Sequence, residues 1–449
     1  MKKIFDKLLQ IFAAGTNVAY TGMDANGDYD PSKAGTINTN TGAANAGDAG
    51  NLSPEMKTFY SKALIRLAGP NLVHDQFGQK RPIPKGNGRT IEFRQFSTLP
   101  KALKKLTEGV TPIGNKMSVS KITATVDQYG DYIEETDLLQ LTAYDDTIGE
   151  DTRALADQAG RTLDTVTRNV LNAGYNVYYC PKVSGGTETE VKKRSDLDAT
   201  AMLRVKDVFR AATILKNVNA QKIGDSYVAI IHPSVAHDLM IEAGVAWIDV
   251  TKYTDLTPIL NGEIGKLGGV RFVESTEAKV FAPEAIADGL NRLHVKTAST
   301  ASTSLVVEEK IATQTPAEAI EVYVKGVKNT VTAITAGSEG DNGYTGTTLT
   351  LGTAATCAVG DMVCGTGAAP DGSAVFSTLF IAKNAYGVTD IEGGGLQHVF
   401  KGLGQNGNDP LNQRSSIGWK ATKTAVILTE AYLLRVESCS SFSDTAEEN

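Results

Sequence analysis

The segment from residue 147 to residue 174 carries the strongest helix signal in the sequence. Its apolar residues recur at steps of three and four and so form one stripe along a helix, made of Ile148, Leu155, Ala159, Leu163, Val166 and Val170. Thr147 and Glu150 form a Thr-x-x-Glu capping box, and Gly174 is typical of a helix end. Such a helix must bury its stripe against a sheet or other helices. We therefore expect it to be the spine of a plate-like domain, with a strand within 126–141 leading into it.

The length and composition are those of a large globular protein. The chain has 449 residues, of which 41% are hydrophobic and 21% charged, so we expect two or three domains. No run of about 18 apolar residues predicts a membrane span. The N-terminal sequence MKKIFDKLLQIFAAG imitates a secretory signal, but Asp6, Lys7 and Gln10 interrupt its apolar part. We interpret it as a short amphipathic helix that docks on a partner or on the chain itself.

Charge and cysteine content narrow the possible partners. With 44 basic and 51 acidic residues the net charge is −7, so the chain as a whole repels nucleic-acid phosphates. The four cysteines are too few for a disulfide scaffold and too widely spaced for a zinc cluster, which fits a reducing compartment. Cys357 and Cys364 flank a turn and can face each other across a hairpin. Whether they are bonded stays open, with unpaired packing the favoured interpretation.

The N-terminal part of the chain is expected to be an arm followed by a helix. Residues 1–51 combine the amphipathic segment with a stretch rich in Gly, Ala, Asn, Thr and Asp, which buries too little apolar surface to be ordered and predicts a flexible arm. Residues 52–83 form an N-terminal helix region, because Ser53 and Pro54 suit a helix start and Gly69-Pro70 ends it.

Residues 84–129 are expected to form an extended β-ribbon. The runs Thr90 to Phe96 and Ser118 to Tyr129 alternate as strands do, and the segment that joins them, Leu99 to Asn115, has no periodicity. Its apolar residues have no core of their own. We therefore predict that the ribbon tip contacts a neighbouring subunit through Leu103, Leu106, Val110 and Ile113.

The rest of the chain predicts a mixed α+β body with an inserted module. After the spine region, 130–200, a layer at 201–282 contains a helix at Val205 to Leu215 with Val208, Phe209 and Ala212 on its apolar side. It continues with strands at Tyr227 to Ile231 and Val270 to Glu274, and with a helix after His232-Pro233. Residues 283–372 are rich in Thr, Ser, Ala and Gly, and their short strands predict a small β-domain, with expected strands at Ser304 to Val307, Ala319 to Val324, Val331 to Ile334 and Thr347 to Leu351. Residues 373–449 complete the sheet with strands at Val375 to Ala382 and Thr424 to Glu437.

No catalytic, cofactor-binding or metal site is predicted. The sequence lacks a Gly-x-Ser-x-Gly elbow, a His-Glu-x-x-His motif, a Cys-x-x-Cys pair and a complete phosphate loop. His232 and His237 lie around a helix start, where capping and packing explain them. Glu134 and Glu135 are adjacent on a strand and point to opposite faces, so they cannot act as a pair. With Asp137 they predict a solvated or inter-subunit salt-bridging face, and we expect no enzymatic activity.

Eight stretches of the chain follow one another in a specific order and spacing: LVHDQFGQKRPIPKGNGRTIEF, LTEGVTP, QYGDYIEETDLL, LADQAGRTLDTVTRN, IHPSVAHDL, GGVRFVES, IAKNAYGV and DPLNQRSSIGWKA. In this order they resemble stretches of tailed-bacteriophage major capsid proteins, in the family that includes the podovirus N-four coat protein. The resemblance covers Leu52 to Glu437 apart from the insert.

The resemblance implies the Hong Kong ninety-seven capsid fold. The ribbon would be its extended loop, residues 148–173 the spine of the peripheral domain, and 205–437 most of the axial domain. It further implies hexamers and pentamers of the chain, portal, scaffolding or decoration proteins as partners, packaged double-stranded DNA at the inner face and no membrane. The chain would be a virion component assembled in the host bacterial cytoplasm. Residues before Leu52 and the insert match nothing in the family's common core, and no residue can be nominated for an inter-subunit isopeptide bond.

A second function class stays open from the residues alone. A secreted adhesin or surface-layer protein is favoured by the Thr/Ala/Gly-rich insert and the signal-like start. An extracellular enzyme is a third interpretation, with no group of residues behind it.

Overall fold

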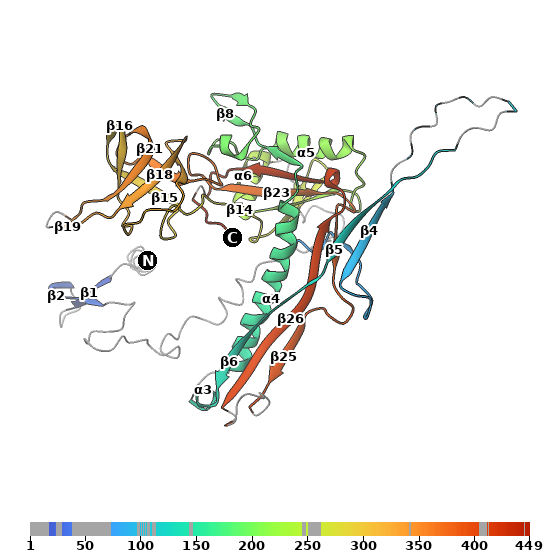
Figure 1. The fold of residues 1–449 in the computed structure, drawn as a ribbon, viewed down its shortest axis with the longest axis horizontal. Coiled ribbons are helices and arrows are strands. Elements are labelled where there is room, and N and C mark those ends of the chain that lie inside the picture. Colours follow the sequence, from blue (N-terminus) through green and yellow to red (C-terminus); the bar gives the residue numbers. More distant parts are fainter. Residues whose placement is uncertain are drawn as a thin grey trace. The chain divides into compact units, whose positions relative to one another are not determined.

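The computed structural model is α+β, with few helices and many strands (Figure 1). It describes residues 18–23, 29–37, 73–142 with gaps within 97–113, 147–244, 248–249, 262–340, 343–403 and 411–449 with gaps at 412 and 444. The chain divides into two compact units, Met1–Gly69 with Asp137–Thr147, and Pro70–Thr136 with Ile148–Asn449. Among the described residues, no helix is both long and apolar enough to cross a membrane.

The first unit contains a β-hairpin and a short helix. Strand β1 (Val18–Met23) pairs antiparallel with β2 (Tyr29–Ile37), and α3 spans Asp137–Thr142. The prediction that residues 24–51 form an arm without regular structure is therefore wrong for 29–37. The sequence has an Asn26-Gly27 dipeptide between the two strands, which is a strong hairpin signal. The prediction of an arm was based on composition and did not use this dipeptide. The predicted amphipathic segment at the N-terminus and the helix from Ser53 lie outside the described residues.

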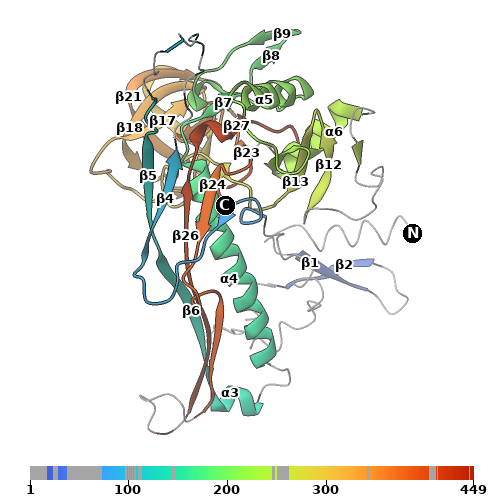
Figure 2. The ribbon, with the colours of Figure 1, turned by 90° about the vertical axis from the view of Figure 1, so that its right-hand side faces the viewer.

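The main core of the second unit surrounds a mixed sheet (Figure 2). Its strand order is β11-β12-β13-β10-β23-β27-β7, with β14 paired to β23. The central strand β10 (Tyr227–Ile231) runs parallel to β13 (Val270–Glu274) and antiparallel to β23 (Val375–Ile381). The remaining strands are β7 (Val177–Tyr179), β11 (Ile248–Asp249), β12 (Glu263–Leu267), β14 (Val280–Phe281) and β27 (Leu433–Ser438). The predicted strands of this layer are confirmed.

Helices α5 (Val205–Asn217) and α6 (Pro233–Ala243) pack their apolar sides into this core. Val208 and Ala212 are buried as predicted, but Phe209 is half exposed. Its ring lies against the β12–β13 turn, where a Cβ added to Gly268 would come within 2.9 Å of the Phe209 ring. Phe209 therefore covers a turn at the edge of the core.

The spine helix α4 spans Thr147–Asn172 and is 26 residues long, or about 39 Å at 1.5 Å per residue. It lies along the long strands β6 (Asp127–Thr136) and β26 (Arg414–Ile427) (Figure 2), which pair antiparallel over ten residues. Strands β25 (Gln397–Lys401), β24 (Tyr386–Thr389) and β3 (Gln79–Lys80) complete this second sheet. Leu155 and Ala159 of the predicted stripe pack on Ile417, Trp419 and Ala421 of β26.

Two predicted strands are divided in the structure. The expected strand 424–437 is wrong, because β26 ends at Ile427, a 3₁₀ turn spans Glu430–Tyr432, and β27 then joins the other sheet. The expected strand 118–129 is also wrong. It divides at the buried Val126, whose N–H donates to the carbonyl of Arg89 at 2.8 Å, into β5 (Val119–Thr125) and β6. Each split moves the chain from one sheet to another.

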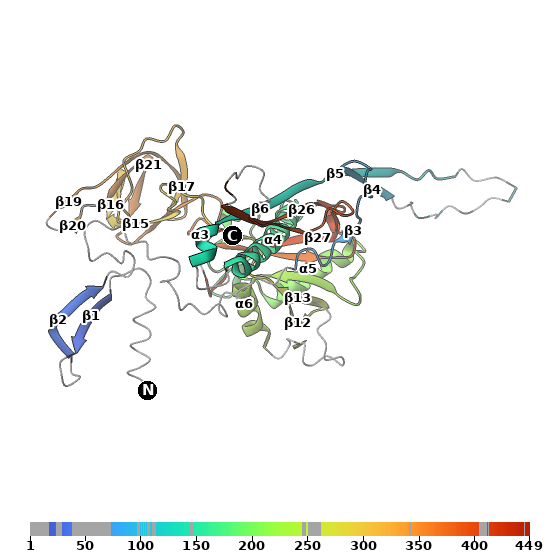
Figure 3. The same cartoon turned by 90° about the horizontal axis from the view of Figure 1, so that it is seen from below.

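Residues 292–365 form a closed barrel with its own core (Figure 3). The strand order is β15-β16-β21-β18-β17-β22, and the strands are β15 (Arg292–Thr297), β16 (Ser299–Val307), β17 (Ile320–Val324), β18 (Val327–Thr335), β21 (Thr347–Cys357) and β22 (Met362–Gly365). The expected strands at 304–307, 331–334 and 347–351 lie within longer ones, and the one expected at 319–324 is β17, which begins one residue later. Strand β14, which precedes the barrel, pairs with β23, which follows it, at Val280↔Phe376 and Phe281↔Val375. All four cysteines are buried and free, so Cys357 and Cys364 are not bonded.

Candidate inter-subunit surfaces

The predicted ribbon forms a sheet of its own. Strand β4 (Thr90–Phe96) pairs antiparallel with β5 in continuous register, from Thr90↔Thr125 to Phe96↔Val119. Among the described strands, no third one is paired with either of them (Figure 1). Because an isolated two-stranded ribbon is marginally stable in water, its ordered state needs support from packing elsewhere.

The base of the ribbon receives that support from the second sheet. Phe93 is buried against β24, at a position where glycine is required, because a Cβ on Gly387 would lie 2.8 Å from the Phe93 ring. Ala124 is buried in β5, and the adjoining Val126 closes the ribbon base by its bond to Arg89. The first residues of the arm are therefore fixed to the body.

The described residues in the far part of the ribbon include exposed apolar side chains. Leu99, Met117 and Val119 are each more than half exposed, and Leu103 is 83% exposed. Single exposed apolar residues are ordinary, but several gathered on an arm mark an interaction surface. Of the predicted contact residues, Leu103 is therefore available to a partner, while Leu106, Val110 and Ile113 lie outside the described residues.

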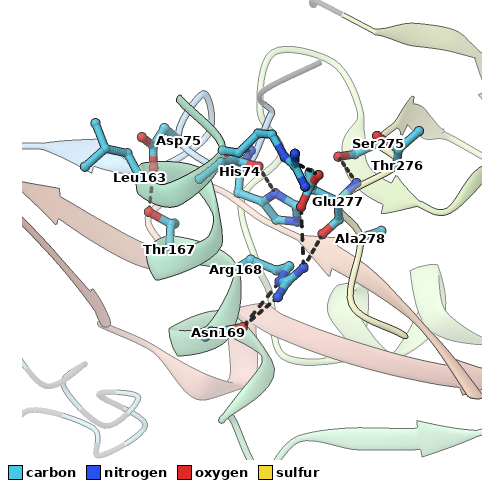
Figure 4. A network of polar contacts seen from close by, with 12 residues as sticks. His74, Asp75, Leu163, Thr167, Arg168, Asn169, Ser275, Thr276, Glu277 and Ala278 are labelled. Carbon is cyan, nitrogen blue, oxygen red and sulfur yellow. Dashed lines mark hydrogen bonds and ion pairs between the residues drawn. The ribbon is translucent and has the colours of Figure 1, made fainter. Parts of the chain in front are cut away.

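The spine helix is joined to the body by a buried polar network (Figure 4). The Asp164 carboxylate accepts the backbone N–H of His74 at 2.9 Å and lies 2.6 Å from the His74 ring Nδ1, with both side chains buried. The Tyr386 hydroxyl donates to the His74 carbonyl. The chain at residue 74 is thus held between α4 and β24.

A second group of contacts joins the helix to its sheet. The Thr167 hydroxyl donates to the Asp75 carboxylate at 2.6 Å, as seen in Figure 4, and Lys423 of β26 forms an ion pair with the same carboxylate. The Lys423 ammonium also donates to the Leu163 carbonyl at 2.7 Å. One carboxylate therefore links residues 73–77, α4 and β26.

Arg168 carries the network to the β13–β14 connection. Its guanidinium donates to the Glu277 carbonyl at 3.0 Å and lies 3.9 Å from the Glu277 carboxylate (Figure 4). Burial lowers the pKa of Arg168, and the nearby Glu277 and Asp164 carboxylates oppose that effect. This arrangement holds charges in place but presents none to a substrate. It is a joint of buried polar contacts between the spine helix and the rest of its unit.

We did not predict this joint from the sequence, although the spacing of its residues indicates a second buried stripe on the helix. Asp164, Thr167, Arg168 and Leu171 recur at three- and four-residue steps, as the apolar stripe does, and these are buried while Val166 and Val170 are half-buried. A hydrophobicity pattern assigns buried charges to the solvated face. Only the spacing of these residues, which repeats at the same three- and four-residue steps as the apolar stripe, could have shown that they are buried.

The other singled-out polar residues lie where structural roles explain them. Glu135 is buried, whereas Glu134 is exposed and 3.7 Å from Arg414, so the two do point to opposite faces. His232 accepts the Ser234 N–H at 3.2 Å as a helix cap, and burial lowers its pKa to about 4. His237 lies 3.5 Å from Asp238. Within the described ranges, no group of three His, Cys, Asp or Glu side chains could hold a metal ion.

A hollow with a volume of about 670 Å³ lies beside α5. Tyr178, Phe209 and Ile214 line it, and its cations are already paired, since Lys206 and Arg210 lie 2.8 and 3.3 Å from Glu188. Glu188 belongs to the hairpin of β8 (Lys182–Ser184) and β9 (Thr187–Thr189). The hollow is open and offers no nucleophile paired with a base, so it does not point to catalysis.

The pKa of Asp151 in α4 provides a test of how this helix packs against β6, which carries Glu135. Burial, and then the carboxyl of Glu135, raise the pKa of Asp151 to about 6 from 3.8. A folded-state pKa above the unfolded one means that the folded protein binds more protons between the two values. The contribution of Asp151 to the free energy of unfolding should therefore fall as pH rises from about 4 to about 6. Asp151→Asn should remove that part of the pH dependence.

The measurement is urea unfolding at pH 4.5 and at pH 7 for the parent chain and the variant. Asp157→Asn, at an exposed position of the same helix, is the matched control and should keep the parent's pH dependence. Equal pH dependence in the parent and in Asp151→Asn would show that the pKa of Asp151 is not raised in the folded protein.

No protein-family model and no curated protein matches the chain. Several solved structures do match it. The capsid of the cyanophage P-SCSP1u is 12% identical, with 81% of this chain and 87% of that chain covered and a TM-score of 0.46. The capsid of Ralstonia phage GP4 is 11% identical, with the same coverage and a TM-score of 0.47. The encapsulin SrpI of Synechococcus elongatus is 9% identical over 90% of this chain and 94% of that chain, with a TM-score of 0.40. The phage capsids among these structures are the class of protein that the sequence resembles.

Proposed function

We propose that this protein is the major capsid protein of a tailed double-stranded DNA bacteriophage, which assembles into hexamers and pentamers that form an icosahedral head. The observation that carries the proposal is the β4–β5 ribbon. It is packed at its base and bears exposed apolar residues beyond it. The ordered series of capsid-like sequence stretches supports the same function.

The physical demands on a shell subunit agree with these features. Rings of five or six copies need heterologous contacts, in which one surface patch of a subunit meets a different patch of the next. A projecting arm supplies one such patch. The subunit must also keep its shape under load, and the buried Asp164 and Arg168 contacts fix the long helix to residue 74 and to the β13–β14 connection. Neither demand requires a catalytic pocket, so we propose a structural protein without enzymatic activity.

The parts of the chain are assigned to the Hong Kong ninety-seven architecture as follows. Residues 84–129 are the extended loop, 130–200 the peripheral domain with the spine helix, and 201–282 with 373–449 the axial and peripheral remainder. Residues 283–372 are an inserted β-domain, and 1–51 and 52–83 are the N-terminal arm and helix region. Pairing of β14 with β23 supports the insertion, because it places the two connections of the barrel side by side.

The proposed partners follow from a place in a phage head. They are further copies of the chain, a portal, scaffolding or decoration proteins, and packaged DNA that touches the inner face without sequence specificity. Assembly would take place in the bacterial cytoplasm, and the finished protein belongs to the virion. The barrel, with its Ser- and Thr-rich strands, would be a solvated module on the outer surface.

Negative-stain microscopy of the purified protein tests the proposal. Closed shells, or free rings of five and six subunits, are the expected result. Flat, extended lattices would instead favour the surface-layer alternative, for which the Thr- and Ala-rich barrel is the specific observation. Recovery of the protein only as a stable, catalytically active monomer would contradict both.

Replacement of Glu284–Asp371 by a short Gly-Ser linker should preserve the folded body and ring formation, at the cost of less robust particles. The barrel has a separate core, and inserted modules with adjacent ends are tolerated because they barely disturb the host core. Of the removed residues, Ala368 and Ala369 pack against the body, in the cluster of Leu197 and Val375. Circular dichroism and negative-stain microscopy check the result. An aggregated or unfolded product would show that the barrel belongs to the core of the axial region.

A further inference from the structure

The last residues of the sequence are held by an unusually complete set of contacts. The Asn449 amide Nδ2 donates to the carbonyls of Ala278 at 2.8 Å and Thr276 at 3.2 Å. Its Oδ1 accepts the Val280 N–H at 3.1 Å and the Arg168 guanidinium at 3.0 Å. Two donors and two acceptor sites are all that an asparagine side chain offers. The site therefore recognises asparagine in full.

The two glutamates that precede Asn449 form ion pairs with Lys279 and Arg292, in the segment that leads into the barrel. Glu448 lies 2.5 Å from the Lys279 ammonium, beside β14. Glu447 lies 3.1 Å from Arg292, the first residue of β15, and accepts the Asn291 amide at 2.6 Å. Ala446 packs against the main core, and its carbonyl accepts Arg292 at 3.3 Å.

The cations of this site are buried, whereas the acidic side chains that reach them are not. Side-chain exposure is 2% for Arg168, 8% for Arg292 and 13% for Lys279, but 70% for Glu447 and 61% for Glu448. A buried cation without a partner is costly, so these groups favour an anionic ligand. The nearby carboxylate of Glu277 is shared between Arg168 and Arg161, which leaves Lys279 and Arg292 to the tail.

The contacts also connect structures that are distant in sequence. Arg168 belongs to α4, Lys279 and Val280 to the connection that leads into the barrel, and Arg292 to the barrel itself. Arg292 further donates to the carbonyl of Gly372, where the chain leaves the barrel, at 2.9 Å. The tail thus bonds the spine helix to the root of the barrel.

We propose that Arg168, Lys279, Val280 and Arg292 form a binding site for an acidic peptide of the type Ala-Glu-Glu-Asn, which residues 446–449 of the same chain occupy. Occupation of the site fixes the root of the barrel to the spine helix. This proposal does not depend on a capsid function, since it concerns contacts within one chain.

The test uses a fluorescently labelled peptide of sequence DTAEEN, which corresponds to residues 444–449, with the full chain and with a chain that ends at Ser443. Fluorescence anisotropy should show saturable binding to the shortened chain that weakens with added salt. The full chain should bind at least about tenfold more weakly, because its own tail competes for the site. Asn449→Ala in the peptide, or Glu447→Lys with Glu448→Lys, should weaken binding by about tenfold or more, the equivalent of about 1.4 kcal/mol.

Hydrogen exchange provides a second readout. Backbone amides at 279–295 and 370–374 should exchange at least about tenfold faster in the shortened chain, and added peptide should restore their protection. If the shortened chain does not fold, the full-length triple variant Glu447→Lys, Glu448→Lys, Asn449→Ala replaces it in both measurements. Equal peptide binding by the full and altered chains, absence of binding to either, or unchanged exchange at the barrel root would overturn the proposal.

Discussion

Deletion of Lys101–Ile113 should abolish assembly and leave a folded subunit. None of the described residues of this segment belongs to the cores of the two sheets, α4 or the barrel. Its removal therefore costs the monomer little. In an assembled shell, however, the exposed apolar side chains of the arm would lose the neighbour on which they are buried. Circular dichroism should report an unchanged fold, while sedimentation and negative stain should show only small species.

A point variant separates loss of contact from shortening of the arm. Val119 in β5 is 51% exposed, and Val119→Asp should reduce the yield of shells by about tenfold or more, because burying an unpaired carboxylate at an interface is costly. Val359→Asp is the matched control, since Val359 is 62% exposed on the barrel. Both variants should change the free energy of unfolding by no more than about 0.5 kcal/mol, as is usual at exposed positions. Shells of normal yield from the deletion or from Val119→Asp would show that the ribbon is not an assembly arm.

The elements that the sequence predicted best are those whose pattern and burial agree. The spine helix begins at Thr147, and β10 and β13 have the expected bounds. In each case a continuous apolar run or stripe faces one core, so local pattern and tertiary packing favour the same structure. The closed barrel could be predicted only as a set of short strands, because closure depends on pairing between residues far apart in the chain, such as β15 with β22.

The strands that were predicted incorrectly change partners partway along. Residues 118–136 alternate throughout, yet β5 pairs with β4 and β6 pairs with β26. Alternation records which face of a strand is buried but not which neighbour it has. The same reason explains 414–438, where Ile427 ends one sheet and Leu433 begins a strand of the other.

For a related reason, the sequence predicted the exposed ribbon tip but not the buried polar network of α4. Leu103 is an apolar residue in a segment of the ribbon that has no core of its own, so the sequence alone could mark it as a contact residue. The structure shows that it is exposed. The buried network of α4 was not predicted, because a charged residue gains its partners only in the folded chain. Arg168 meets Glu277, 109 positions away, and no local pattern encodes that contact.

Asp164→Ala should be the most destabilising single substitution in the spine helix, with a loss of about 3–5 kcal/mol in the free energy of unfolding. The carboxylate is buried and is the acceptor for the backbone N–H of His74, and it also faces the His74 ring nitrogen and favours the charge of Arg168. Truncation leaves these groups buried without that partner, and a backbone N–H without an acceptor alone costs about 1–3 kcal/mol.

Urea unfolding followed by tryptophan fluorescence measures the effect, since Trp419 lies in the interface between α4 and β26 and donates to the Gln158 side chain at 3.2 Å. Asp157→Ala, at an exposed position of the same helix, is the control and should change the free energy of unfolding by no more than about 0.5 kcal/mol. Asp164→Asn should fall between the two, because its amide oxygen can still accept the His74 N–H although the charge is lost. A loss below about 1 kcal/mol in Asp164→Ala would mean that the joint is not what holds the helix to the body, and that the apolar contacts of Leu155 and Ala159 suffice.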